Sequence, residues 1–206
     1  MDELAEFDRD ALEALRGPLE DGRVAIARVG RAVVLPSRFQ LVAAMNPCPC
    51  GHAGDDTVPC RCPRAVAGRY AARISGPLRD RIDLWVAMPR IAPAELVRGP
   101  APEGSAAVAE RIATARRLQL ARSGRLNCRL SGRALRAACR LGPTAEARAI
   151  AIADARDLSA RGTERLLRVA RTIADLGGAE RVACEDLDEA SRYRQPGGLD
   201  LRQGAA

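Results

Sequence analysis

Four of the seven cysteines crowd into one short stretch of the chain, and thiolates bind soft metal ions. They form the pattern Cys48-x-Cys50, nine residues, then Cys60-x-Cys62, in a segment rich in glycine, proline and aspartate. Four thiolates suit a tetrahedral structural Zn²⁺, which would order a loop this poor in core residues. The spacing is tighter than the usual C-x-x-C, so reduced thiols and disulfides stay open as alternatives. We predict a zinc site in the loop 48–62.

A pair of carboxylates, Asp2 and Glu3, lies near the first residue of the chain. At the end of a buried strand, such a pair suits a Mg²⁺ held through water and a base that orients an attacking water. These are the two tasks of a nucleotide hydrolase. By itself, an Asp-Glu dipeptide is more often a solvated terminus or a helix-start pair, so the residue types alone do not assign these tasks.

An amide side chain, Asn46, follows the almost wholly apolar segment Phe39–Met45. The segment predicts a strand buried on both faces of a mostly parallel sheet, and such sheets bind ligands at the carboxyl ends of their strands. An amide there can hold a water or a phosphate oxygen without adding charge. The alternative is a turn asparagine before Pro47.

Arginine supplies all 33 basic residues, because the sequence contains no lysine. A P-loop of the form GxxxxGK[ST] is therefore absent from the chain. With 26 acidic residues the net charge is +7, which agrees with nucleic acid as a partner. Only 2% of the residues are aromatic, so stacking platforms are lacking, and binding would depend on the phosphate backbone and weaken with salt.

The length of 206 residues allows one or two domains with a sizeable core. No run of 18 apolar residues and no secretory signal occurs, so we expect a cytoplasmic protein without a membrane partner. An odd number of cysteines and no sign of secretion favour a metal site or reduced thiols over a disulfide framework.

Two kinds of pattern follow each other along the chain. The first part predicts a helix capped by Asp8 and then four further elements: a hairpin over Gly22–Leu35, strands over Phe39–Met45 and Ile82–Met88, and a helix over Arg64–Ile74. The later part predicts helices throughout: Ser105–Arg122, Ser131–Arg140, Thr144–Asp157, Ser159–Leu176 and Cys184–Tyr193. We expect an α/β part at 1–92, a proline-rich linker at 93–104, a helical domain at 105–194 and a flexible tail at 195–206.

Four groups of residues, taken together, resemble one family in its order and spacing. They are Asp2–Phe7, Phe39–Gly51, Arg73–Leu84, and Leu158–Arg161 followed by Val169–Leu176. The chain resembles the YifB/ComM type of magnesium-chelatase-like AAA+ ATPase from Met1 to about Arg194. The match is to the carboxyl-terminal part of such a protein, and the residues that would carry the P-loop would lie before Met1. The resemblance implies a partial AAA+ core, with a sensor-1 strand, a hairpin insertion and a fifth strand, followed by an all-α lid.

The resemblance also implies a role for individual residues. Asp2 would hold Mg²⁺ through water, and Glu3 would orient the attacking water. Asn46 would be sensor 1, and Arg81 would be the arginine finger that reaches a neighbour's γ-phosphate. Arg161, in the first turn of its helix, would be sensor 2 and contact nucleotide.

The hairpin matches in position an insertion that some AAA+ motors direct into a central pore. Arg23, Arg28 and Arg31 would then face the phosphates of DNA. The alternative is a solvated hairpin edge, where positive charges also block strand pairing.

The family implies ATP and Mg²⁺ as cofactors, a hexameric ring, and ATP-driven remodelling of DNA. Of such activities, we expect DNA branch migration or a helicase-like activity that serves competence or recombination. Because the P-loop is absent, we expect this chain by itself neither to bind ATP tightly nor to hydrolyse it, and its status as an enzyme stays open. One alternative is a non-catalytic, zinc-stabilised module that binds DNA or a partner. Another is the ATPase subunit of a metal chelatase.

Overall fold

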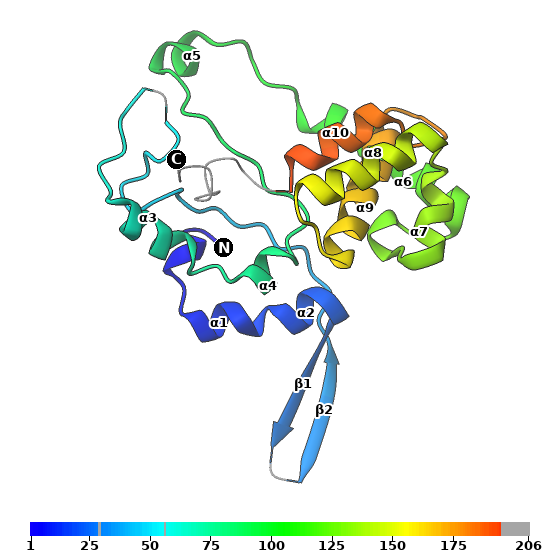
Figure 1. The fold of residues 1–206 in the computed structure, drawn as a ribbon, viewed down its shortest axis with the longest axis horizontal. Coiled ribbons are helices and arrows are strands. Elements are labelled where there is room, and N and C mark those ends of the chain that lie inside the picture. The colour runs from blue at the N-terminus through cyan, green and yellow to red at the C-terminus, as the bar shows by residue number, and fades with distance from the viewer. Residues whose placement is uncertain (29, 56, 195–206) are drawn as a thin grey trace. The chain divides into compact units, whose positions relative to one another are not determined.

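A computed structural model of the chain describes residues 1–28, 30–55 and 57–194. The chain divides into two compact units, of which the first runs from Met1 to Ile82 and the second begins at Asp83 (Figure 1). The predicted tail, 195–206, lies outside the described residues. The predicted linker, 93–104, contains a short helix, α5 (Pro93–Arg98). Its proline at the first helical position and its acidic first turn favour helix initiation.

The first unit contains short helices and one hairpin. Its elements are η1 (Leu4–Glu6), α1 (Arg9–Ala14), α2 (Arg16–Asp21), β1 (Arg23–Arg28), β2 (Arg31–Pro36), α3 (Arg64–Ala71) and α4 (Gly76–Arg79). Asp8 caps α1 by accepting a hydrogen bond from the Asp10 N–H at 2.8 Å, as the sequence predicts. The helices α1 and α2 meet at Leu15, just before Gly17 and Pro18.

The predicted hairpin is present as an antiparallel pair. Its register runs from Arg23 opposite Pro36 to Arg28 opposite Arg31. In the described part of the chain, β1 and β2 form the one sheet. Every residue of β2 is exposed, including Val33 and Val34, so the hairpin has no core behind it.

The two other predicted strands are wrong. Phe39–Met45 and Ile82–Met88 are both without regular secondary structure. Apolar composition predicts a buried strand only where neighbouring strands complete its hydrogen bonds. Among the described residues, the backbone of Phe39–Met45 hydrogen-bonds only to Met1 and Leu4, and Val42 is 70% exposed. The expected α/β class therefore appears only as a helical chain with one small sheet.

The segment after Ile82 is bound by the helices of the second unit. The Trp85 N–H donates to the Tyr193 carbonyl at 2.8 Å, and Arg165 Nε lies 2.9 Å from Asp83 Oδ1. In this part of the described chain, a backbone hydrogen bond to a helix end occurs where the ladder of a fifth strand is expected.

The second unit is helical, as predicted. It contains α6 (Ser105–Ser123), η2 (Asn127–Arg129), α7 (Gly132–Cys139), α8 (Pro143–Ala155), α9 (Ala160–Leu176) and α10 (Cys184–Arg192). Ser159 caps α9 by accepting from the Gly162 N–H at 3.1 Å. The long helix α9 packs against α6, α7, α8 and α10. The core is made of small and branched apolar side chains, which include Leu135, Ala138, Cys139, Ala149, Ile152, Leu166, Ala170, Leu187 and Ala190.

One charged network is buried in this core. The Arg171 side chain is 0% exposed, and its Nη2 lies 2.9 Å from Asp175 Oδ1, one turn along α9. Arg122 donates to both oxygens of Asp175, at 2.6 and 2.8 Å, and Asn127 donates to Oδ2 at 2.8 Å. The network joins α6 and η2 to α9, and it explains the Arg-x-x-x-Asp spacing within Val169–Leu176.

Candidate functional site

The first residues of the chain pair with the segment that leads to Asn46. The Met1 amino group donates to the Val42 carbonyl at 2.8 Å, and the Ala44 N–H donates to the Met1 carbonyl at 2.9 Å. The Leu4 N–H then donates to the Ala44 carbonyl at 2.8 Å. The two Met1 bonds follow the hydrogen-bond pattern of parallel neighbours, and the Leu4 bond lies one residue beyond that register. It brings the backbone that carries the carboxylate pair beside the backbone that leads to Asn46.

Glu3 has an uncommon backbone conformation. Its φ of 48° and ψ of 49° lie in the left-handed region, which costs a residue other than glycine of order 1 kcal/mol or more. Its N–H donates to Asp2 Oδ1 at 3.0 Å. The next two residues hold this conformation in place, because Leu4 is 2% exposed and Ala5 is fully buried. The side chains of Asp2 and Glu3 are exposed, as a role in binding ligand from solvent requires.

Asn46 lies over the first turn of the cysteine loop. Gly51 closes that turn, since its N–H donates to the Cys48 carbonyl at 2.9 Å. A Cβ added at Gly51 would lie 4.0 Å from the Asn46 Oδ1 atom, and the φ of +81° at Gly51 also favours glycine. The turn that carries Cys48 and Cys50 is thus the immediate neighbour of the amide.

The four predicted cysteines come together. All four sulfur atoms lie within 4.8 Å of one another. The distance from Cys48 Sγ is 3.4 Å to Cys50 Sγ and 3.7 Å to Cys60 Sγ, and Cys50 and Cys60 are 3.6 Å apart. A tetrahedron with Zn–S bonds of about 2.3 Å has edges of about 3.8 Å. The donor set and its spacing fit zinc, whereas a disulfide would need a sulfur separation of about 2.05 Å.

Hydrogen bonds around the cluster give its thiols different pKa values. Hydrogen bonds from the backbone N–H groups of His52 and Arg61 lower the pKa of Cys50 to about 5. A hydrogen bond with Cys50 raises the pKa of Cys62 to about 12. Cys48 is buried and Cys60 is exposed. The backbone hydrogen bonds favour the thiolate form of Cys50, and because a metal ion binds thiolates, ion binding would be coupled to the release of thiol protons.

Between the two cysteine pairs, Asp55 organises the loop. Its Oδ1 accepts from the Thr57 hydroxyl at 2.6 Å, the Thr57 N–H at 2.7 Å and the Val58 N–H at 3.1 Å. These bonds lower the pKa of Asp55 to about 2. The resulting turn brings the Cys60 pair back toward the Cys48 pair.

Arg81 follows α4, which Ser75 caps by accepting from the Leu78 N–H at 3.2 Å. Its side chain is 11% exposed and is held within the first unit. Nη1 donates to the Pro77 carbonyl at 2.7 Å, and Nη2 forms an ion pair with Glu20. The sequence offered no signal for Glu20, because the two residues are 61 positions apart.

The remaining predicted residues lie elsewhere. Arg161 is the second residue of α9, in the second unit, and it is exposed. Arg23 and Arg31 are exposed on the hairpin, whereas only the backbone of Arg28 is described. The structure thus brings Asp2 and Glu3 near the segment of Asn46, and it assigns Arg81 an ion pair inside its own unit.

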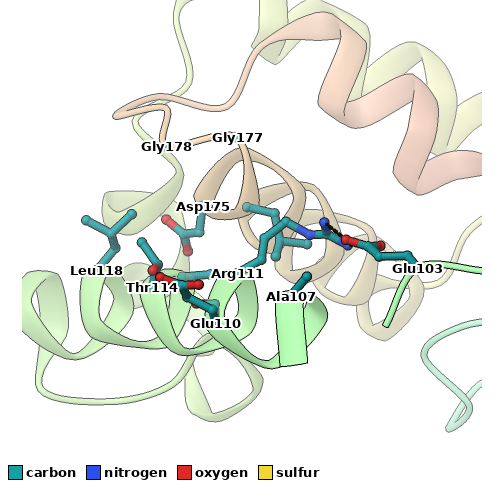
Figure 2. Close-up of a pocket in the computed structure, with 11 residues that line it drawn as sticks. Glu103, Ala107, Glu110, Arg111, Thr114, Leu118, Asp175, Gly177 and Gly178 are labelled. Carbon is teal, nitrogen blue, oxygen red and sulfur yellow. Dashed lines mark hydrogen bonds and ion pairs between the residues drawn. The ribbon is translucent and has the colours of Figure 1, made fainter. Parts of the chain in front are cut away.

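A cavity of about 510 Å³ lies in the second unit, between α6 and the end of α9 (Figure 2). Three of its four charged lining residues are paired, since Arg111 donates to Glu103 at 2.7 Å and Asp175 belongs to the buried network. None of the predicted site residues lines it. In the described part of the chain, no helix combines the length and hydropathy needed to cross a bilayer.

Comparison with known proteins covers both units. A family model described as "Magnesium chelatase, subunit ChlI" matches residues 1–96, and one described as "Magnesium chelatase, subunit ChlI C-terminal" matches residues 102–194. The chain belongs to the magnesium-chelatase-like family.

Individual proteins with similar sequences support the same family assignment. The chain is 39% identical over 195 residues to the competence protein ComM of Haemophilus influenzae, and 40% identical over 196 residues to YifB of Escherichia coli. Each match covers 94% of this chain and 38% of the relative, in the relative's carboxyl-terminal part. An uncharacterized protein of Mycobacterium tuberculosis is 40% identical over 201 residues, covering 96% of this chain and 39% of the relative. The chain therefore spans about two fifths of the length of the curated relatives it matches.

Proposed function

We propose that this chain supplies part of an ATP-driven motor that remodels DNA. The observation that carries the proposal is the backbone pairing of Met1–Leu4 with Val42–Ala44. It sets the carboxylate pair beside the segment of Asn46, in a member of a family whose models are those of magnesium chelatase.

Each polar group has a defined task in this proposal. Asp2 holds Mg²⁺ through water, and Glu3 orients the water that attacks the γ-phosphate. Asn46 hydrogen-bonds that water or a γ-phosphate oxygen, adding no charge. Exposure of Asp2 and Glu3 supports the assignment, and so does the left-handed backbone at Glu3, because strained backbone is concentrated at functional sites.

Arg81 acts on a neighbouring subunit. An arginine that reaches a γ-phosphate stabilises the charge that develops in phosphoryl transfer, an effect that can reach about 10³ to 10⁵ in rate. In the isolated chain Glu20 serves as its counter-ion, so Arg81 exchanges one anion for another when a neighbour presents nucleotide. Arg161, at the first turn of α9, contributes to nucleotide binding as sensor 2. The resemblance to the family implies a hexameric ring, in which the adjacent subunit would present its nucleotide to Arg81.

Zinc has a structural task in this proposal. Four thiolates close the coordination sphere, so no water is activated there. A metal held by Cys48, Cys50, Cys60 and Cys62 cross-links the two ends of the loop. The turn Cys48–Gly51, which lies under Asn46, is thereby held in one conformation.

DNA is the proposed substrate. A net charge of +7, carried entirely by arginine on the basic side, favours a polyanion. One relative is named a competence protein. The hairpin residues Arg23, Arg28 and Arg31 are the proposed contacts with its phosphates.

The test begins with the coding sequence upstream of Met1, searched for an open frame through GxxxxGK[ST]. If it is found, the encoded polypeptide should hydrolyse ATP, DNA should stimulate it, and Asn46→Ala and Arg81→Ala should each abolish most turnover. The chain alone should show no ATP turnover above buffer, since it has no P-loop lysine. Rapid ATP turnover by the purified 206 residues would contradict the assignment.

A second candidate function is a zinc-stabilised module that binds DNA without nucleotide. The cysteine geometry favours it independently of any ATPase residue. DNA affinity that is unchanged by ATP, together with a stop codon upstream of Met1, would favour this candidate over the motor.

A further inference from the structure

The helical unit contains a long stretch with positive charges only. Residues 111–145 hold nine arginines and no aspartate or glutamate, although 26 acidic residues occur in the whole chain. The stretch begins within α6, includes η2 and α7, and ends in the first turn of α8. It is separate from the hairpin, which lies in the first unit.

Some of these arginines are occupied by partners. Arg111 pairs with Glu103, Arg122 with Asp175, and Arg117 donates to the Thr114 hydroxyl. In the described part of the chain, the side chains of five others are exposed and make no hydrogen bond or ion pair: Arg116, Arg125, Arg129, Arg133 and Arg136.

The geometry of α7 gathers two of these charges, Arg133 and Arg136, on one side. Leu135, Ala138 and Cys139 are buried against the core. Arg133 and Arg136 are three positions apart and therefore share the opposite face, which continues to Arg140 at the end of the helix. The exposed residues between them, Ala134 and Ala137, are too small to keep a ligand's backbone away.

Acidic groups near α7 do not neutralise this face. The Glu164 carboxylate accepts from the Gly132 N–H, at the first residue of α7, at 2.8 Å and from Arg168 at 3.1 Å. Its oxygens are therefore already hydrogen-bonded to groups other than the arginines of α7. Glu180 lies 3.7 Å from Arg140, but its side chain is 86% exposed, and such a pair contributes little in water.

We propose that Arg125, Arg129, Arg133, Arg136 and Arg140 form a surface, the α7 arginine surface, that binds the phosphate backbone of nucleic acid. The inference rests on the proposed function, since it assumes DNA as substrate, and it adds a second contact beyond the hairpin. A guanidinium group is planar and can form bidentate hydrogen bonds with a phosphate. The basic residues of this surface, all of which are arginines, are therefore suited to bind phosphates.

The chemistry of the surface favours nucleic acid over other polyanions. A helix that lies on a membrane needs large apolar side chains beside its basic ones, and α7 exposes only alanines there. Protein interfaces are enriched in aromatic anchors, and residues 105–192 contain no aromatic residue. Charge without apolar or aromatic anchors is sufficient for backbone contacts that do not depend on base sequence.

The experiment measures binding of the whole chain to a fluorescein-labelled 30-nucleotide single strand and a 30-base-pair duplex. The test variant is Arg129→Gln/Arg133→Gln/Arg136→Gln. The matched control is Arg98→Gln/Arg156→Gln/Arg192→Gln, which removes three exposed arginines elsewhere in the second unit and leaves the same net charge. A third variant replaces Arg23, Arg28 and Arg31 of the hairpin with Gln. Circular dichroism and thermal unfolding verify that all the variants are folded.

Each phosphate contact contributes about 0.7 to 0.9 to the slope of log affinity against log salt. We therefore expect the test variant to lose about 2 in slope and about tenfold to 100-fold in affinity at 0.1 M salt. The control should stay within about twofold of the parent. A test variant that binds like the control would overturn the inference.

The hairpin variant separates this inference from the proposed function. If it loses affinity while the test variant matches the control, DNA binding stands and the α7 arginine surface is wrong. If the parent chain binds neither DNA at 50 mM salt, the proposed substrate itself fails. Vesicles with 30% phosphatidylserine serve as the alternative polyanion, and binding to them that depends on α7, without DNA binding, would also overturn the inference.

Discussion

Glu20 and Arg81 form an ion pair inside the first unit, between the helix that precedes the hairpin and the turn that follows α4. The guanidinium is also held by the Pro77 carbonyl, 2.7 Å from Nη1. A residue expected to serve a neighbouring subunit is thus positioned by its own chain. In the proposed function, an external phosphate would have to displace Glu20 from the Arg81 guanidinium.

The Glu20–Arg81 pair should be measurable in the chain alone. A double-mutant cycle with Glu20→Gln and Arg81→Gln should give a coupling of about 1 kcal/mol in the free energy of unfolding by urea, because Arg81 is mostly buried and Glu20 only partly so. Arg73 and Glu6, an exposed pair 2.8 Å apart, provide a control cycle with a smaller coupling. Strictly additive effects at Glu20 and Arg81 would contradict the pairing.

The cysteine cluster should bind one zinc ion per chain. Cys60→Ser removes an exposed ligand, and Cys128→Ser removes an exposed thiol outside the cluster. Metal analysis of the purified proteins should give about one zinc for the parent and for Cys128→Ser, and much less for Cys60→Ser. A chelator should lower the melting temperature of the parent but have little effect on Cys60→Ser. Equal zinc content in the two variants would rule out the assigned ligands.

The pairing of Met1–Leu4 with Val42–Ala44 should protect particular amides. Leu4 and Ala44 donate backbone hydrogen bonds across the pair, whereas the amides of Ala43 and Met45 donate none in the described structure. Hydrogen exchange followed by NMR should therefore be slower at Leu4 and Ala44 than at Ala43 and Met45. Uniform fast exchange from 42 to 45 would mean that the two segments separate in solution.

The buried network of α9 should make the helical unit sensitive to acid. Burial by itself raises the pKa of Asp175, but hydrogen bonds from Arg122 and Asn127 and the charge of Arg171 outweigh it, so the pKa lies below its ordinary value of 3.8. A carboxyl group with a lowered folded pKa stabilises the fold above pH 3.8, and that contribution disappears as the pH falls through the folded value.

Asp175→Asn tests this dependence. Because it leaves Arg171 buried without its carboxylate, we expect a loss of about 3 to 5 kcal/mol at pH 7. Urea unfolding from pH 7 down to pH 2 should show a smaller loss of stability for the variant than for the parent. Asp188→Asn, which removes an exposed ion pair with Arg148, is the control and should change stability by about 1 kcal/mol or less. Equal pH dependence of Asp175→Asn and the parent would show that Asp175 does not cause it.

Local patterns were sufficient for much of the fold. The predicted helices of the second unit agree with α6 to α10 to within about two residues, because helical periodicity and, for α9, the Ser159 cap act within a few positions of the chain. The hairpin and the gathering of four cysteines also follow from short-range spacing. Phe39–Met45 was predicted wrongly, because a strand depends on neighbours that its own composition does not specify.

The sequence by itself determined the helical unit, the hairpin, the cysteine cluster and the family. Only the tertiary structure decided that Arg81 pairs with Glu20, that Arg171 and Asp175 are buried together, and that Met1 lies beside Ala44. The physical reason is the range of the interactions involved. Caps and helical faces are set by residues a few positions apart, whereas ion pairs and backbone pairing between distant segments depend on how the chain folds back on itself.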